Sequence, residues 1–268
     1  MTRTIRNVMR TVPSEPIGFL EYTAETNGPW WETVTVTISQ SPVSHIELSA
    51  DGNTIVFRVH TRGADSVEAA RMFADPLVEQ QVDRLAFLYT CNIADLVFTS
   101  GSVAPPPHVN PDGTVTCQVT AFSARAMITA SATVAPMSLG PGSRDHLRDS
   151  LEEGGLSGEA YFRRFRQALA TDESVGKFMA LYQIIETLYG MRPKTQQDID
   201  NAIRDLQPGV EVKPSPHRST GDETVYTRLR NETSHSRRGA SFEVTRAEIK
   251  QHLNGLTELV KKAIAEQL

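Results

Sequence analysis

The stretch Leu229–His235 reads LRNETSH and lies between two helical patterns, in the half of the chain that is predicted to be mainly helical. An arginine is always charged, and its planar fork of donors matches the oxygens of a phosphate. A histidine can give or take a proton near neutral pH. Asn231 and His235 are four residues apart, so on a helix they share one face. This combination suits cleavage of an RNA backbone without a metal; the alternative is that Arg230 is a surface charge and His235 caps a helix C-terminus.

Helical patterns surround this stretch on both sides. Apolar residues recur at helical spacing between Gly, Pro and capping residues. They predict helices at Glu159–Ala170, Ser174–Tyr189, Thr195–Leu206 and Thr220–His235, and a last one from Thr245 onward. Three stretches have the spacing of a capping box, in which two side chains satisfy N–H groups of the first helical turn: Thr195–Asp198, Thr220–Glu223 and Thr245–Glu248. We therefore expect an antiparallel helical bundle.

Glu186 occupies an unusual position in the second of these helices. It falls on a stripe of larger, mainly apolar side chains, which are Val175, Met179, Tyr182 and Tyr189. A buried carboxylate is costly unless it is paired. Two interpretations stay open: either Glu186 pairs with Arg230 and fixes its fork, or the helix is rotated so that Glu186 lies at the edge of the core.

Together with its flanking helices, the stretch resembles the signature of the HEPN superfamily, small helical domains of which many are RNases. That signature is an arginine, a polar residue, a short spacer and a histidine; here Arg230 is followed by an amide, a spacer and His235. As in that family, a long apolar helix precedes it, Phe178–Tyr189, and a long helix follows. The resemblance covers about Tyr161–Leu268 and is closest to the Apea-like group, which is linked to abortive infection.

The resemblance implies a metal-independent endoribonuclease without a cofactor. Arg230 and Asn231 would hold and polarise the scissile phosphate, and His235 would move a proton at the 2′-hydroxyl or the leaving 5′-oxygen. Glu186 would support Arg230. Because one motif offers a single proton-transfer group, two subunits are expected to form a homodimer whose two motifs line one cleft. A local positive rim for RNA is expected from Arg228, Arg237, Arg238 and Arg246.

The alternative is a non-catalytic helical module that binds a nucleotide, RNA or another protein. Glu232, inside the motif, weakens the attraction to phosphate. The chain as a whole carries a net charge of −5, whereas non-specific nucleic-acid binders are usually basic. Residues 144–268 carry 19 basic and 19 acidic side chains, so the acidic excess lies in the rest of the chain and any RNA contact must be local.

The N-terminal half is predicted to be a β-rich α+β domain, and we recognise no family in it. Strand patterns begin at Ile17, and a turn at Asp51–Asn53 predicts a hairpin. A helical segment is expected from Ser66 to Cys91, kinked or split at Pro76. The expected strands, in chain order, are Thr33–Ile38, Val43–Ser49, Thr54–His60, Asp95–Thr99, Thr114–Phe122 and Ala126–Val134, with a Pro-rich exposed loop at Ala104–Gly113.

Other candidate site residues in this half have structural interpretations that we prefer. Trp30 and Trp31 could stack on a base, but paired tryptophans more often anchor a loop to the core. His45, His60 and His108 have no ligand partner at the sequence spacing of a metal site. We therefore expect no catalytic or metal centre here, and interpret this half as a sensor or regulatory module.

The Gly- and Pro-rich stretch Ala135–Ser143 predicts a linker, which divides the chain into domains 1–142 and 143–268. A short charged helix is expected from Arg144 to Glu153. The basic start of the chain lacks the apolar core of a secretory signal, and no apolar run approaches the ~20 residues of a membrane span. Two cysteines, Cys91 and Cys117, form no disulfide framework, and a single disulfide between them is the alternative to a reduced pair. We expect a reduced, cytoplasmic protein.

Overall fold

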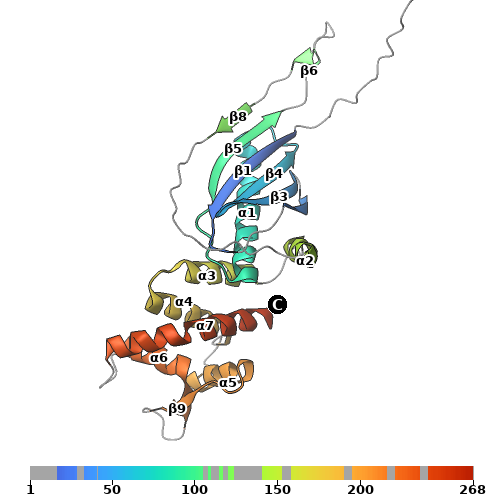
Figure 1. Ribbon diagram of the computed structural model, residues 1–268. Coiled ribbons are helices and arrows are strands. Elements are labelled where there is room, and N and C mark those ends of the chain that lie inside the picture. The colour runs from blue at the N-terminus through green and yellow to red at the C-terminus, as the bar shows by residue number, and fades with distance from the viewer. Residues whose placement is uncertain are drawn as a thin grey trace, which may run out of the picture. The chain divides into compact units, whose positions relative to one another are not determined.

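The computed structural model describes residues 17–28, 33–40, 42–104, 108–109, 115–116, 120–123, 141–152, 158–189, 195–215, 221–235 and 241–267. These residues form seven helices and an antiparallel sheet with two small two-stranded ribbons, a mixed α+β structure (Figure 1). They fall into two compact units, Met1–Glu79 with Asp95–Glu152, and Gln80–Ala94 with Glu153–Leu268. The first unit therefore includes a stretch beyond residue 142, and the second includes a stretch far before it, unlike the two consecutive domains expected from the linker pattern.

The first unit is built on a six-stranded sheet with the order β2-β3-β4-β1-β5-β8. Its strands are β1 (Ile17–Glu25), β2 (Val34–Gln40), β3 (Val43–Asp51), β4 (Thr54–Arg62), β5 (Val97–Ala104) and β8 (Thr120–Ser123). A short ribbon pairs β6 (His108–Val109) with β7 (Val115–Thr116). The predicted hairpin is confirmed, since β3 pairs with β4 around Gly52, whose φ of 58° suits a tight hairpin turn that other residues adopt less readily.

The sheet alternates between a buried and a more open face. On β1, Leu20, Tyr22 and Ala24 are buried, whereas the residues between them are only partly covered. Helix α1 (Val67–Tyr89) packs its first part on the buried face, where the Tyr22 hydroxyl donates to Asp75 at 2.5 Å (Figure 1). This alternation is the pattern of a sheet covered on one side only.

Pro76 lies inside α1 and does not split it. A proline inside a helix loses one backbone hydrogen bond and costs about 3 kcal/mol. Ala74 and Val78 on either side of it are fully buried, and this packing outweighs the loss. Of the two expected effects of Pro76, a split of the helix is therefore wrong, and a kink stays a prediction.

Two expectations about the rest of this unit need correction, and others concern residues that the structure does not describe. The strand expected at Asp95–Thr99 begins later, at Val97, and extends to Ala104, the first residue of the expected loop, as β5. The end of the expected linker belongs to α2 (Pro141–Glu152), because proline is well suited to the first turn of a helix. Trp30, Trp31 and the strand expected at Ala126–Val134 lie outside the described residues.

The second unit is helical. It contains α3 (Glu159–Ala170), α4 (Ser174–Tyr189), α5 (Gln196–Leu206), α6 (Val225–His235) and α7 (Phe242–Ala265), with β9 (Val212–Pro214) paired to β10 (Asp222–Thr224). Helix α4 contacts α3, α5, α6 and α7, so it lies at the centre of the packing (Figure 1). The core includes aromatic and aliphatic side chains from each of these helices, among them Phe165, Phe178, Ile203, Tyr226 and Leu256.

The capping predictions have mixed outcomes. The capping box of α5 is confirmed, because the Asp198 carboxylate accepts a 2.7 Å bond from the backbone N–H of Thr195. The other two are wrong. Helix α6 begins at Val225, since the preceding three residues pair with β9 instead of opening the helix. Helix α7 begins at Phe242, after Ser241, and the hydroxyl of Thr245 bonds elsewhere.

None of the described helices combines the length and the hydropathy that crossing a lipid bilayer requires.

Candidate functional site

Arg230 projects from α6 toward α4, and its guanidinium is held by two neighbours. Its Nη2 lies 3.0 Å from Oε1 of Glu186, and its Nη1 donates to Oδ1 of Asn231 at 3.2 Å. The side chains of Arg230 and Glu186 are 26% and 30% exposed. Glu186 thus pairs with Arg230 and also lies at the edge of the core. The two interpretations left open by the sequence do not exclude each other. Each Nη carries two N–H groups, so each keeps one for a further acceptor.

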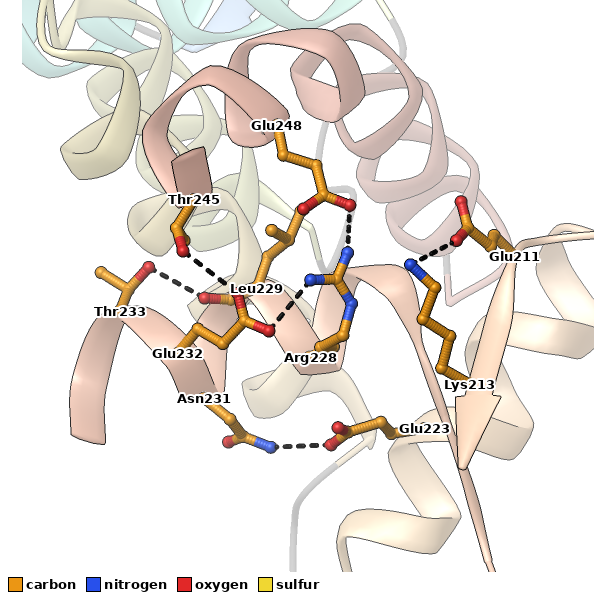
Figure 2. Close-up of polar contacts among 10 residues, drawn as sticks. All are labelled: Glu211, Lys213, Glu223, Arg228, Leu229, Asn231, Glu232, Thr233, Thr245 and Glu248. Carbon is orange, nitrogen blue, oxygen red and sulfur yellow. Dashed lines mark hydrogen bonds and ion pairs between the residues drawn. The ribbon is translucent and has the colours of Figure 1, made fainter. Parts of the chain in front are cut away.

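Asn231 is oriented from the opposite side. Its amide Nδ2 donates to Oε2 of Glu223 at 3.2 Å, as Figure 2 shows, while its oxygen accepts from Arg230. Glu223 belongs to β10 and is buried. The two motif residues therefore form the middle of a chain that runs from the Glu186 carboxylate to the Glu223 carboxylate. Sequence reasoning missed Glu223, which was interpreted only as part of a capping box.

Arg228, expected on an RNA-binding rim, is engaged by carboxylates on both sides. It bonds to Glu232 at 2.9 Å and to Glu248 of α7, and its side chain is 11% exposed (Figure 2). Burial opposes its charge, but the bonds to Glu248 and Glu232 outweigh burial and raise its pKa. Glu232 also accepts a 3.1 Å bond from the hydroxyl of Thr245. This cluster ties α6 to α7, and it leaves little of the charge of Arg228 for a ligand.

A buried polar network lies under the start of α6. Asp200, fully buried on α5, accepts 3.0 Å bonds from both the backbone N–H and the hydroxyl of Thr224. The chain continues through Thr227 to the Tyr182 hydroxyl, 2.9 Å away, which accepts a 3.0 Å bond from Gln196. Burial raises the pKa of Tyr182 to about 12, so its hydroxyl stays protonated at neutral pH. The network fixes the first turn of α6, and with it the direction of the motif.

The remaining predicted site residues are placed only in part. His235 is the last residue of α6, and its side chain lies outside the description, as do Arg237 and Arg238 altogether. Arg246 on α7 is half exposed and lies 3.6 Å from Glu173. Hydrogen bonds from the backbone N–H groups of Gly176 and Val175 lower the pKa of Glu173, which marks it as a cap of α4.

A second group of chemically competent side chains lies in the first unit. His45 and His60, which have no ligand partner at the sequence spacing of a metal site, both lie close to Glu47. One ligand atom from each of the three lies within 4.8 Å of the other two. The side chain of His108 lies outside the description. The signal that would have found this group is the register of the predicted hairpin, which sets His45 directly opposite His60.

The chain matches no protein-family model, and neither a curated protein nor a solved structure matches it.

Proposed function

We propose that the protein is a metal-independent endoribonuclease of HEPN type, whose second unit forms an antiparallel helical bundle and acts as a homodimer. The observation that carries the proposal is the guanidinium of Arg230, which Glu186 holds at 3.0 Å while about a quarter of the side chain stays exposed. An arginine fixed in this way offers its remaining N–H groups in a set direction. A phosphate can then bind without first ordering a flexible side chain.

The proposed chemistry starts with the 2′-hydroxyl of RNA. A base removes its proton, the oxygen attacks the adjacent phosphorus, and the bond from phosphorus to the 5′-oxygen breaks. The products are a 2′,3′-cyclic phosphate and a 5′-hydroxyl, which takes up a proton from an acid. Arg230 and Asn231 bind the charge that develops on the phosphate oxygens, and His235 transfers a proton. In a homodimer the two copies of His235 supply the base and the acid.

Electrostatics restrict where RNA binds. Arg228 is neutralised by two carboxylates, so Arg246 and the adjacent pair Arg237 and Arg238 are the better candidates for contacts with the phosphate backbone. We propose that such an enzyme acts in the cytoplasm, in phage defence or a stress response, with the first unit as its regulatory part.

The test is cleavage of a labelled RNA in the presence of a chelator. We expect the wild type to cut RNA but not DNA, and to leave 2′,3′-cyclic phosphate ends. His235→Ala removes a proton-transfer group and should slow cleavage by about 10²–10⁴-fold. His252→Ala is the matched control, because this histidine of α7 lies outside the motif, edge-on to Tyr226, and should cut at the wild-type rate.

Equal rates for the wild type and His235→Ala would overturn the proposal and point to a contaminating nuclease. If two subunits share one site, excess His235→Ala subunits mixed with the wild type should inhibit its activity, because mixed dimers form. Activity that falls only in proportion to dilution would exclude the shared cleft.

A second candidate function is a non-catalytic module that binds a nucleotide, RNA or a protein. The surplus of carboxylates around α6 favours it, since Glu223, Glu232 and Glu248 all lie within bonding distance of α6 side chains (Figure 2). Saturable RNA binding without cleavage, unchanged by His235→Ala, would support this candidate over the enzyme.

A further inference from the structure

Three polar side chains gather on the open face of the sheet in the first unit. His45 and Glu47 are two apart on β3, so they point to the same face, while the intervening Ile46 is buried on the other. His60 on β4 is the register partner of His45. Because this pairing belongs to a tight hairpin, the three side chains are held together by backbone hydrogen bonds rather than by loops.

The distances suit a shared cation. Nε2 of His60 lies 3.3 Å from Oε2 of Glu47, and Nε2 of His45 lies 3.9 Å from Oε1 of the same carboxylate. The two imidazole rings stack with their centroids 4.1 Å apart, so both Nε2 atoms approach Glu47 from one side. Bonds of about 2.0–2.2 Å in a tetrahedron separate the ligand atoms by roughly 3.3 Å. The His60 pair already has this separation, and His45 needs only a small side-chain rotation.

A neighbouring hydroxyl determines which nitrogen of His45 is available. Ser44 Oγ donates to the backbone oxygen of His60 at 3.1 Å and lies 3.1 Å from Nδ1 of His45. Since the proton of Ser44 is already used, Nδ1 of His45 must carry the hydrogen of that second contact. In neutral His45 the lone pair is then on Nε2, which faces the Glu47 carboxylate. Burial lowers the pKa of His45, as do the nearby His60 and Arg62, whereas Glu47 acts in the opposite direction.

His60 contributes a buried nitrogen atom without a hydrogen-bond partner among the described residues. This atom, Nε2, faces Glu47. A nitrogen lone pair and a carboxylate oxygen repel each other unless a proton or a metal ion lies between them. A proton can satisfy one of these nitrogens, whereas a metal ion satisfies both and the carboxylate together.

We propose that His45, Glu47 and His60 bind a divalent transition-metal ion, with zinc as the best fit to two imidazoles and one carboxylate. Three protein ligands leave one coordination position open to water or a ligand. The bond between Ser44 and Nδ1 of His45 is the outer contact that orients a metal-binding histidine. This site belongs to the first unit and is independent of the RNA cleavage proposed for the second.

The experiment is a calorimetric titration of the full chain with zinc chloride, after chelation and desalting, at a pH where histidine is neutral. We expect the wild type to bind one more ion per chain than His60→Ala. Glu47→Gln keeps the side-chain shape and should weaken this site by more than 100-fold. Ser44→Ala leaves all three ligands in place and should weaken it by about 10–100-fold. Circular dichroism of each variant establishes that the sheet is intact.

Two control variants sharpen the result. His252→Ala removes a histidine of the second unit and should bind zinc as the wild type does. Arg62→Gln removes a positive charge that acts on His45 and should tighten binding. The proposal fails if the wild type takes up no zinc, or if His60→Ala and Glu47→Gln bind it in the same amount and with the same affinity. RNA cleavage in chelator is measured in parallel, so failure of one proposal does not affect the other.

Discussion

At the scale of single residues, the ion pair between Glu186 and Arg230 should stabilise the fold measurably. Glu186→Ala leaves the guanidinium, whose Nε is buried without a hydrogen-bond partner among the described residues, with only its bond to Asn231. We expect the free energy of unfolding to fall by about 1 kcal/mol, since the pair is only partly shielded from solvent. Denaturant unfolding followed by circular dichroism measures this.

Glu211→Ala is the matched control. Glu211 forms a 3.0 Å pair with Lys213, and both side chains are about half exposed (Figure 2). Such surface pairs contribute roughly 0–0.5 kcal/mol. If Glu186→Ala costs no more than Glu211→Ala, then Glu186 is simply a surface residue and does not fix the motif.

Residue-level prediction worked where the signal was local. The helical period placed Glu186 on an otherwise apolar stripe, and this made its pairing with Arg230 one of two explicit interpretations. The pair between Arg228 and Glu232 has the spacing of an intrahelical ion pair, but we had expected Arg228 on an RNA-binding rim. The second partner of Arg228, Glu248, could not be seen, because it comes from another helix. The fully buried Asp200 was missed for the same reason, since its partner Thr224 is remote in the sequence.

At the scale of elements, Gly255 controls how closely α7 approaches α6. A Cβ at this position would lie 2.6 Å from the Tyr226 hydroxyl, which donates to Gln207 at 3.1 Å. Alanine is favoured over glycine in a helix by about 1 kcal/mol, yet we expect Gly255→Ala to lower the melting temperature, because the tyrosine must move and lose its bond. Thermal unfolding of the full chain is the measurement.

Two variants test this explanation. In a Tyr226→Phe background the obstructing oxygen is gone, so Gly255→Ala should become stabilising. At Gly176 in α4 an added Cβ would lie 3.1 Å from the methyl group of Thr171, a partly exposed side chain that can rotate, and at an ordinary contact distance of 3.6 Å from Oε2 of Glu173. Gly176→Ala should therefore be neutral or stabilising. A melting temperature that falls equally in both backgrounds would mean that Tyr226 is not the cause.

The starts of helices show why local sequence determines elements only in part. Thr195 and Asp198 form the capping box that their spacing predicts. Thr224 is drawn into a bond with Asp200, and the residues before it pair with β9, so α6 starts later than its sequence pattern suggests. The alternation of β3 and β4 was readable because one face of the sheet is buried, and the register of that hairpin already contained the pairing of His45 with His60.

At the scale of the whole molecule, α1 contributes residues to both units, and Phe87 near its end belongs to the core of the second. Its ring centroid lies 4.5 Å from that of Phe162. We expect Phe87→Ala to destabilise the second unit by about 3–4 kcal/mol, because it leaves a cavity among aromatic side chains. Hydrogen exchange of the full chain should show faster exchange in α3.

Phe73→Ala is the control on the same helix, since Phe73 is 49% exposed. It should leave exchange in α3 unchanged. Slower or unaltered exchange in Phe87→Ala would contradict the assignment of the end of α1 to the second unit.

The two-unit organisation was the part of the fold least accessible to sequence reasoning. Gly and Pro near residue 142 suggested a single division, but the apolar pattern of α1 runs without interruption through the true change of unit. Tertiary contacts hold the end of α1 in the second unit. Arg166 bonds to the buried Asp83 at 2.6 Å, and Lys261 of α7 donates to the backbone oxygen of Leu88 at 2.9 Å. None of these partners is close in sequence.

Because α1 belongs to both units, it also limits which parts of the gene a crossover can exchange. A genetic crossover near residue 142 would give the helical part to a new host gene without Phe87 and Asp83, and its core would lack one wall. A crossover near residue 80 would supply that wall, but it would also carry β5, β8 and α2, which belong to the first unit. A single crossover therefore cannot exchange either unit whole, because each unit is made of two separate stretches of the chain.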